Sequence, residues 1–153
     1  MSGIKGQRAL SHEHFMKLAL QEAQTAFDQD EVPVGAVLVV NQQVIARAHN
    51  LTELLRDVTA HAEMQIITMG ADYLGGKFLD ECQLYVTLEP CPMCAGALYW
   101  SRIGSLIYGA SDSKRGYTSI SEKALLHPKT QVVSGVLETA CSEILSTYFK
   151  LKR

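Results

Sequence analysis

Two short motifs constrain the fold of this chain more than any other feature. They are His61-Ala62-Glu63 and Pro90-Cys91-Pro92-Met93-Cys94. An imidazole and two thiolates are ligands that suit zinc, and one shared ion forces the two motifs together in space. Cys91 and Cys94 are spaced to project from the same side of a first helical turn. We therefore expect two helices that face each other and begin at the same site.

Three protein ligands leave one tetrahedral position open for water, as in catalytic zinc sites and unlike closed structural ones. Residues two apart in a helix point about 200° away from each other, so Glu63 is expected to miss the ion that His61 binds. Glu63 is then available to carry protons as a general base and acid. This combination of H-x-E with P-C-x-x-C is already known as the signature of zinc-dependent nucleobase deaminases.

Composition indicates a single folded domain that spans residues 1–153. The chain is 47% apolar and only 20% charged, which is enough apolar surface for a sizeable core. No apolar run reaches the roughly 18 residues that cross a bilayer, and the N-terminus lacks an export signal, so we expect a cytoplasmic protein without a membrane partner. With a formal net charge of −2, any nucleic-acid partner requires a local basic patch. Cys82 and Cys141 are expected in the core.

Hydrophobic patterning predicts strands that alternate with helices. Strands are expected at 34–40, 44–48, 83–87, 105–109 and 132–133, and helices at 12–29, 60–69, 91–101 and 143–150. Ser11 and Thr59 are the expected N-caps of the first two helices. The nearly continuous apolar run at 34–40 predicts a strand that is buried on both faces. The pattern favours a three-layer α/β/α sandwich with a central mixed sheet.

Further segments carry a resemblance to a known family. The chain closely resembles the cytidine deaminase-like superfamily at Pro33-Val34-Gly35-Ala36-Val37, Asn50, 59–63, 89–97 and Ser101-Arg102-Ile103. The run Tyr108-Gly109-Ala110-Ser111-Asp112-Ser113-Lys114-Arg115-Gly116 is similar to the TadA-type tRNA adenosine deaminases. The similarity extends from the opening helix to Tyr148-Phe149-Lys150, which is nearly the whole chain.

This resemblance implies one zinc ion per subunit and the conversion of adenosine to inosine at the wobble position of a tRNA anticodon, with release of ammonia. It implies that Asn50 and the backbone near Ala36 contact the flipped nucleoside, and that Asp112 holds the bent anticodon-loop backbone. It also implies a homodimer whose partner chain helps to form the RNA groove. Cations meet phosphates and aromatic rings stack on unpaired bases, so further RNA contacts are expected from Lys114, Arg115, Tyr148, Phe149, Lys150, Lys152 and Arg153.

Two other functions stay open on the sequence alone. A guanine or nucleoside deaminase that acts on a free base would share the second motif. A zinc-stabilised RNA-binding module without turnover would need a fourth ligand, such as Cys82, and would have no use for Glu63. His49 stands where the family often has an aromatic ring, and Tyr117 where a small residue is usual; the sequence assigns neither of them a role.

Overall fold

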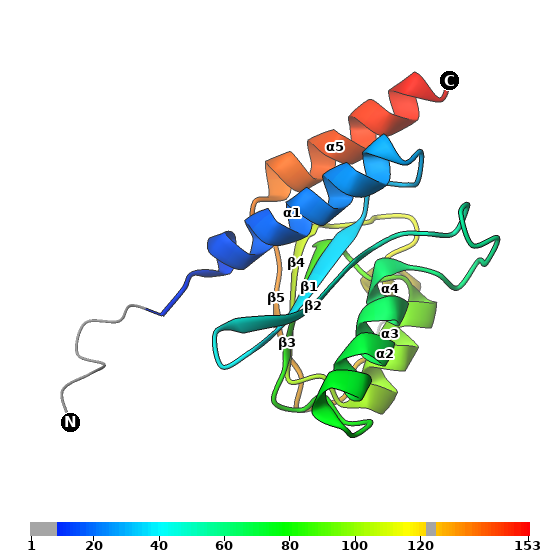
Figure 1. Ribbon diagram of the computed structural model, residues 1–153. Helices are drawn as coiled ribbons and strands as arrows, with labels where there is room; N and C mark the ends of the chain where they lie inside the picture. The colour runs from blue at the N-terminus through cyan, green and yellow to red at the C-terminus, as the bar shows by residue number, and fades with distance from the viewer. Residues whose placement is uncertain (1–8, 122–124) are drawn as a thin grey trace.

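The computed structural model describes residues 9–121 and 125–153, and it is built on one mixed sheet (Figure 1). The five strands lie in the order β2-β1-β3-β4-β5. β1 is antiparallel to both β2 and β3, whereas β4 runs parallel to β3 and to β5. The strand bounds are β1 Gly35–Val40, β2 Gln43–His49, β3 Gln83–Leu88, β4 Ser105–Ala110 and β5 Gln131–Val133. The expected mixed sheet is confirmed.

Helices cover both faces of this sheet, which confirms the three-layer α/β/α sandwich (Figure 1). On one face lie α1 (His12–Asp28) and α5 (Glu138–Leu151), which contact each other. On the other face lie α2 (Ala62–Leu74) and α3 (Pro92–Ser101), and the short α4 (Tyr117–Ile120) contacts α3. The core is therefore divided by the sheet into two apolar clusters.

Strand β1 connects these two clusters. Val37 and Val39 pack in the cluster that holds α1, and Ala36 and Leu38 pack in the cluster that holds α2. All four side chains are completely buried, so a strand buried on both faces is confirmed. The alternation follows from the two-residue period of a strand, which sends successive side chains to opposite faces.

The first helix and the first hairpin begin and turn as their sequences indicate. Ser11 caps α1, because its side chain accepts a hydrogen bond of 3.1 Å from the N–H of His14. Asn41 and Gln42 connect β1 to β2 with φ of 49° and 65°. Two successive positive φ angles define the type I′ turn, whose twist matches that of a hairpin.

The bounds of two helices differ from the sequence prediction. Thr59 does not cap α2, because its N–H and hydroxyl both donate to the carboxylate of Asp57, and α2 begins at Ala62. The helix also runs past the expected end at residue 69, and it ends where Gly75 adopts φ of 72°. α5 begins at Glu138 rather than at residue 143, after a left-handed Leu137 without a side-chain cap.

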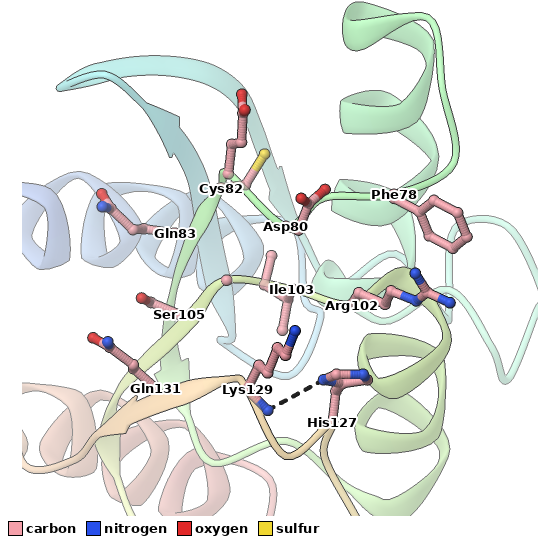
Figure 2. A pocket seen from close by; sticks show the side chains of 12 residues that line it. Phe78, Asp80, Cys82, Gln83, Arg102, Ile103, Ser105, His127, Lys129 and Gln131 are labelled. Carbon is pink, nitrogen blue, oxygen red and sulfur yellow. Dashed lines mark hydrogen bonds between the residues drawn. The ribbon is translucent and has the colours of Figure 1, made fainter.

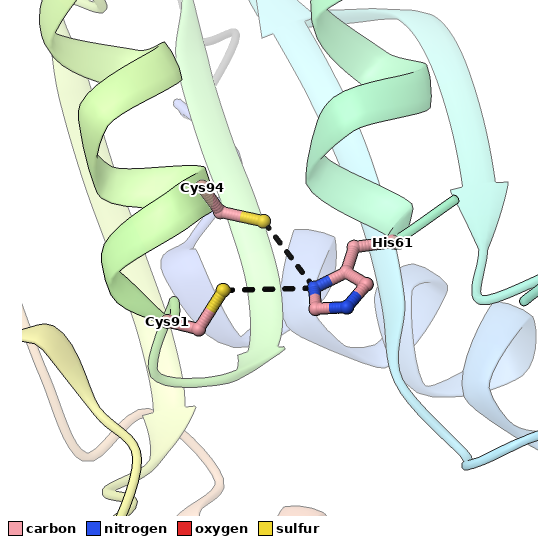
Figure 3. A group of neighbouring side chains, drawn as sticks. All are labelled: His61, Cys91 and Cys94. Carbon is pink, nitrogen blue, oxygen red and sulfur yellow. Dashed lines mark hydrogen bonds between the residues drawn. The ribbon is translucent and has the colours of Figure 1, made fainter. Parts of the chain in front are cut away.

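Residues 1–8, which were considered above for an export signal, and residues 122–124 of the segment between β4 and β5 lie outside the described residues. Within the described part of the chain, no helix is both long enough and apolar enough to span a membrane. α2 and α3 lie side by side on one face of the sheet, and their N-termini lie close together (Figure 3). These N-termini fix the position of the candidate site described below.

Candidate active site

The three residues expected to bind a metal come together where α2 and α3 begin (Figure 3). His61 occupies the N-cap position of α2, Cys91 occupies that of α3, and Cys94 lies in the first turn of α3. His61 Nδ1 is 3.7 Å from Cys91 Sγ and 3.4 Å from Cys94 Sγ. All three donor atoms lie within 4.8 Å of one another. The sequence prediction that the two motifs meet is therefore correct.

These distances fit a tetrahedral ion. Zinc bonds of about 2.3 Å to sulfur and about 2.0 Å to nitrogen, at a tetrahedral angle, place the two ligand atoms about 3.5 Å apart. The observed separations of 3.7 and 3.4 Å bracket this value. A His and two Cys also form a donor set that suits zinc better than it suits oxygen-preferring cations. The residues present therefore fit a metal ion of this kind.

The charges of the cluster favour a cation as well. A hydrogen bond from Cys94 lowers the pKa of Cys91 to about 4, and the same contact raises the pKa of the Cys94 thiol. A hydrogen bond with Cys91 raises the pKa of His61. The three donors therefore include one thiolate and still hold a proton. A bound cation would displace that proton. The partial positive charge at the start of α3 further favours the thiolate.

Glu63 lies next to this group but is not one of its members. Its side chain is 3% exposed, and Oε1 is the one buried side-chain oxygen or nitrogen without a hydrogen-bond partner among the described residues. Burial raises the pKa of this carboxyl to about 7. A buried carboxyl with one unpartnered oxygen and a pKa near neutrality is suited to accept and return protons.

Asn50 joins the site through the start of α2. Its side chain is buried, and Oδ1 accepts a hydrogen bond of 2.9 Å from the N–H of Ala62. Asn50 thereby satisfies one of the four open N–H groups at the start of α2, the role expected of Thr59. Because the oxygen is engaged, the amide nitrogen is the part of the side chain left to donate to a ligand.

A pocket of about 620 Å³ opens over His61, Cys91 and Glu63. Its walls also include residues just before β1 and just after β2, the loop after β4, and the last helix. Of the residues expected to contact the substrate or RNA, the pocket is lined by Asn50, Asp112, Lys114, Arg115 and Phe149. The volume lies within the range that is typical of small-molecule sites.

Other predicted contact residues lie elsewhere. Ala36 is completely buried in β1 and is not part of the pocket lining. Tyr148 donates its hydroxyl to the backbone carbonyl of Asp30, and Lys152 forms an ion pair with the Asp30 carboxylate. Lys150 and Arg153 are exposed at the end of α5. His49 hydrogen-bonds Gln29 and Glu22 on α1, and Tyr117 is buried in the core.

A different hollow, of about 580 Å³, lies at the edge where β3, β4 and β5 begin (Figure 2). Arg102 stacks its guanidinium over the ring of Phe78 there, at 4.3 Å from the ring centre. Asp80 and Lys129 also line it. None of the three metal-binding residues belongs to its lining, so the pocket over Glu63 is the candidate active site.

Two further carboxylates beside the pocket were not assigned a role from the sequence. Glu31 and Glu89 are 1% and 3% exposed, and each accepts hydrogen bonds from a loop that forms a pocket wall. The only signal in the sequence is a charged residue next to apolar neighbours, which does not identify distant partners. Glu89 stands inside one of the segments that carry the family resemblance, directly before Pro90.

The fold and the donor set are those of the cytidine deaminase-like class of enzymes. A family model described as MafB19-like deaminase matches residues 10–153, and the chain belongs to this family. Members of such a family are hydrolytic enzymes that remove an amine from a nucleobase, in agreement with the open metal site and the buried Glu63.

Individual relatives show which group of deaminases the chain is similar to. A tRNA-specific adenosine deaminase from Agrobacterium fabrum is 48% identical over 144 residues, which cover 92% of this chain and 95% of the relative. One from Bacillus subtilis is 46% identical over 142 residues, which cover 90% of this chain and 88% of the relative. These relatives confirm the resemblance to the TadA-type tRNA adenosine deaminases.

Solved structures agree with this placement. One from a study of A-to-I editing by tRNA:A34 deaminases at the wobble position superposes with a TM-score of 0.80 at 48% identity, over 86% of this chain and 99% of that chain. A guanine deaminase from Bacillus subtilis superposes with a TM-score of 0.64 at 36% identity, over 76% of this chain and 72% of that one. The fold is thus shared with an enzyme that acts on a free base.

Proposed function

We propose that this protein is a zinc-dependent hydrolase that deaminates adenosine to inosine at the wobble position of a tRNA anticodon. The observation that carries the proposal is the buried Glu63 beside a group of three side chains that could hold a metal ion. A closed structural site has no use for such a carboxyl. The tRNA-specific adenosine deaminases among the relatives support the choice of substrate.

Zinc held by His61, Cys91 and Cys94, one ion per subunit, would supply a Lewis acid that makes water nucleophilic near neutral pH. Glu63 takes a proton from the attacking water. It delivers this proton to the purine ring nitrogen. It then carries the second proton of that water, from the new hydroxyl on C6, to the amine, which leaves as ammonia while the oxygen stays on C6. With its pKa near 7, this carboxyl both accepts and donates protons at neutral pH.

The pocket residues divide into contacts for the base and contacts for the RNA backbone. The amide of Asn50 would donate to the flipped nucleoside, since its oxygen already holds α2. Only the backbone near Ala36 would contact the base edge, because the Ala36 side chain is buried and does not line the pocket. Asp112 would hold the anticodon-loop backbone, and Lys114 and Arg115, exposed at the rim, would pair with phosphates.

The last helix completes the proposed RNA surface. Phe149 is 46% exposed and lines the pocket, where its ring would stack on an unpaired base. Lys150 and Arg153 are exposed for phosphate contacts. Tyr148 hydrogen-bonds the backbone carbonyl of Asp30, and Lys152 pairs with the Asp30 carboxylate. Both side chains are therefore engaged within the protein and would contact RNA only at the edge of α5.

The test is an inosine assay on an anticodon stem-loop with adenosine at the wobble position, alongside free guanine, cytosine and cytidine. Wild-type protein is expected to form inosine in the stem-loop. Glu63→Gln is expected to keep its zinc and to lower kcat by about 10²–10⁴-fold, the usual contribution of a general acid–base group. Loss of zinc in this variant would instead make Glu63 a ligand and contradict the mechanism.

A guanine deaminase is the second candidate, because the Bacillus subtilis guanine deaminase shares the fold. Guanine carries its amine on C2, so its recognition requires other contacts at the base edge. Ammonia from guanine with no inosine in the stem-loop would decide for this candidate. Zinc-loaded protein that binds the stem-loop and deaminates neither substrate would decide for a binding module.

We also propose a cytoplasmic homodimer that pairs through the outer face of α2 and α3. Trp100 and Tyr73 are 77% and 63% exposed on these helices, and Met69 is 43% exposed. Large exposed apolar side chains on two helices that contact each other suit an interaction surface. Light scattering is expected to give the mass of two chains for wild type and of one chain for Trp100→Glu. A monomeric wild type would contradict the proposal.

A further inference from the structure

Glu89 connects a substrate-facing loop to the metal-binding motif. It lies between the end of β3 and Cys91, and its side chain is 3% exposed. Oε1 accepts a hydrogen bond of 3.1 Å from the N–H of Asp112. Oε2 accepts hydrogen bonds of 3.0 Å from the N–H and 2.6 Å from the hydroxyl of Thr118. Three donors from one loop thus converge on one buried carboxylate.

The loop at 111–118 is shaped to approach this carboxylate. A Cβ added at Gly116 would lie 2.2 Å from Glu89 Oε2 and 2.6 Å from the carbonyl oxygen of Asp112, so only glycine fits between them. The N–H of Tyr117 donates to the carbonyl of Pro90 at 2.9 Å. The loop is therefore fastened to both of the residues that directly precede Cys91, Glu89 and Pro90.

This loop forms one wall of the pocket. Ser111, Asp112 and Ser113 line it together with His61 and Glu63. The side chain of Asp112 also accepts hydrogen bonds from the N–H groups of the next basic residues, at 3.1 and 3.0 Å, which fixes the tip of the loop. Movement of the wall relative to the metal ligands would require these bonds to Glu89 to break.

A second part of the pocket wall, at Thr52, is held in the same way by Glu31. This carboxylate is 1% exposed and accepts hydrogen bonds of 2.9 and 2.8 Å from the N–H groups of Glu53 and Leu54. The hydroxyl of Thr52 donates to it at 3.4 Å, and Thr52 lines the pocket. The two segments lie far apart in sequence, and the second one includes the first turn of α4, where Thr118 binds Glu89.

A purely structural role does not account for this arrangement. Burying a carboxylate has a large desolvation cost, and an apolar side chain of similar size is often as stabilising. None of the ion pairs of the described residues involves Glu31 or Glu89, so backbone N–H groups and hydroxyls offset that cost. What the two carboxylates provide is a fixed position for two loops that face the substrate.

We propose that Glu31 and Glu89 are positioning residues for the deamination reaction, each fixing one wall of the pocket relative to the metal site. The inference rests on the proposed function for its kinetic part. The walls contact the substrate and not the reacting atoms, so the two residues set the fraction of molecules that are competent to bind. When that fraction falls, the apparent affinity for the substrate falls in the same proportion.

The experiment compares Glu89→Gln with Glu31→Gln in the zinc-loaded full chain. An amide cannot accept at both of its ends, so one or two hydrogen bonds to each loop are lost. A hydrogen bond to a charged group corresponds to roughly a tenfold change in an equilibrium constant, so KM for the stem-loop is expected to rise about 10-fold. The expected kcat and zinc content equal those of wild type.

Amide hydrogen exchange supplies a second readout that does not depend on activity. Glu89→Gln is expected to accelerate exchange in 111–118 and not in 52–54, and Glu31→Gln is expected to do the reverse. Each variant therefore serves as the control for the other. An unchanged KM, or a fall in kcat at constant KM, would overturn the proposal, as would exchange that rises throughout the chain.

A milder variant keeps the proposal testable if Glu89→Gln fails to fold. Thr118→Val removes one of the three donors and preserves the shape of an exposed side chain. Its KM is expected to rise about 3-fold, as for one modest hydrogen bond, and Thr118→Ser is expected to restore it. If wild type forms no inosine, the proposed function fails, whereas the exchange pattern still decides whether the carboxylates fix the loops.

Discussion

Gly35 is the residue at which α1 comes closest to the sheet, and Gly35→Ala tests that packing. A Cβ at this position would lie 2.1 Å from the carbonyl oxygen of Ala19 and 2.3 Å from the backbone nitrogen of Ala23. Both are helix backbone atoms, so rotation of a side chain cannot relieve the overlap. Ordinary contact begins near 3.4 Å, so α1 must move away from β1 by more than 1 Å.

The cost follows from what α1 buries. Phe15, Met16, Ala19, Ala23 and Ala26 are all at most 1% exposed against the sheet and α5. A gap of 0.5–1 Å already loses about a quarter to a half of the dispersion energy of each contact. Overpacking a core usually costs about 1–3 kcal/mol, and a backbone overlap belongs at the upper end. We expect Gly35→Ala to lower the free energy of unfolding by about 3 kcal/mol.

Urea unfolding of the zinc-loaded protein, followed by circular dichroism, measures this change. Gly96→Ala in α3 is the matched control, because an added Cβ there meets nothing within 4 Å. It is expected to stabilise the protein by about 0.5–1 kcal/mol through helix propensity. If Gly35→Ala unfolds within about 1 kcal/mol of wild type while the control behaves as expected, the close approach of α1 to β1 is wrong.

Three further predictions concern the site. In metal-free protein, the raised pKa of Glu63 contributes stability that is complete below about pH 4.5 and is lost as the pH rises through 7. Between about pH 5 and about pH 8, the free energy of unfolding of wild type, measured in urea, should therefore fall by about 2–3 kcal/mol more than that of Glu63→Gln. Asn50→Ala should lower stability by about 1 kcal/mol and raise KM, whereas Asn50→Asp should restore the stability alone. In mass spectrometry after alkylation of metal-free protein at neutral pH, Cys91 should react first, whereas Cys141, with its pKa raised to about 12 by burial, should not react until unfolding.

Each of these predictions has a result that contradicts it. Parallel pH dependence in wild type and Glu63→Gln would show that Glu63 titrates normally. Recovery of KM by Asn50→Asp would show that the amide nitrogen of Asn50 does not bind substrate. Rapid alkylation of Cys91 in zinc-loaded protein would remove it from the ligand set, because a coordinated thiolate is protected from the reagent.

The meeting of the three donor side chains was predictable from the sequence because its geometry is local. Cys91 and Cys94 share one helical turn, and His61 starts another, so two helix N-termini are enough to bring the three donors together. The sandwich was predictable for a similar reason, since β1 has a nearly uninterrupted apolar sequence. Ser11 likewise caps its own helix within three residues.

The features that sequence patterns missed depend on distant partners. Thr59 has the right chemistry to cap α2, but Asn50 is placed there by the end of β2 and provides the bond instead. Glu89 binds a loop more than twenty residues further along the chain. In α5, successive residues point about 100° apart, so Phe149 reaches the pocket while Tyr148 turns toward Asp30. The RNA contacts of Tyr148 therefore stay a prediction.

Two buried carboxylates line the pocket and a third, Glu31, binds its wall at Thr52; the hydrogen-bond donors around each one distinguish their roles. Glu31 and Glu89 each accept hydrogen bonds from three donors, which makes them fixed acceptors for loops. Glu63 is equally buried, but its Oε1 has no donor, and burial raises its pKa to about 7. Burial alone therefore does not distinguish a proton carrier from a structural acid. A donor newly provided to Glu63, for instance by a neighbouring serine hydroxyl, should lower its pKa and slow turnover without loss of zinc.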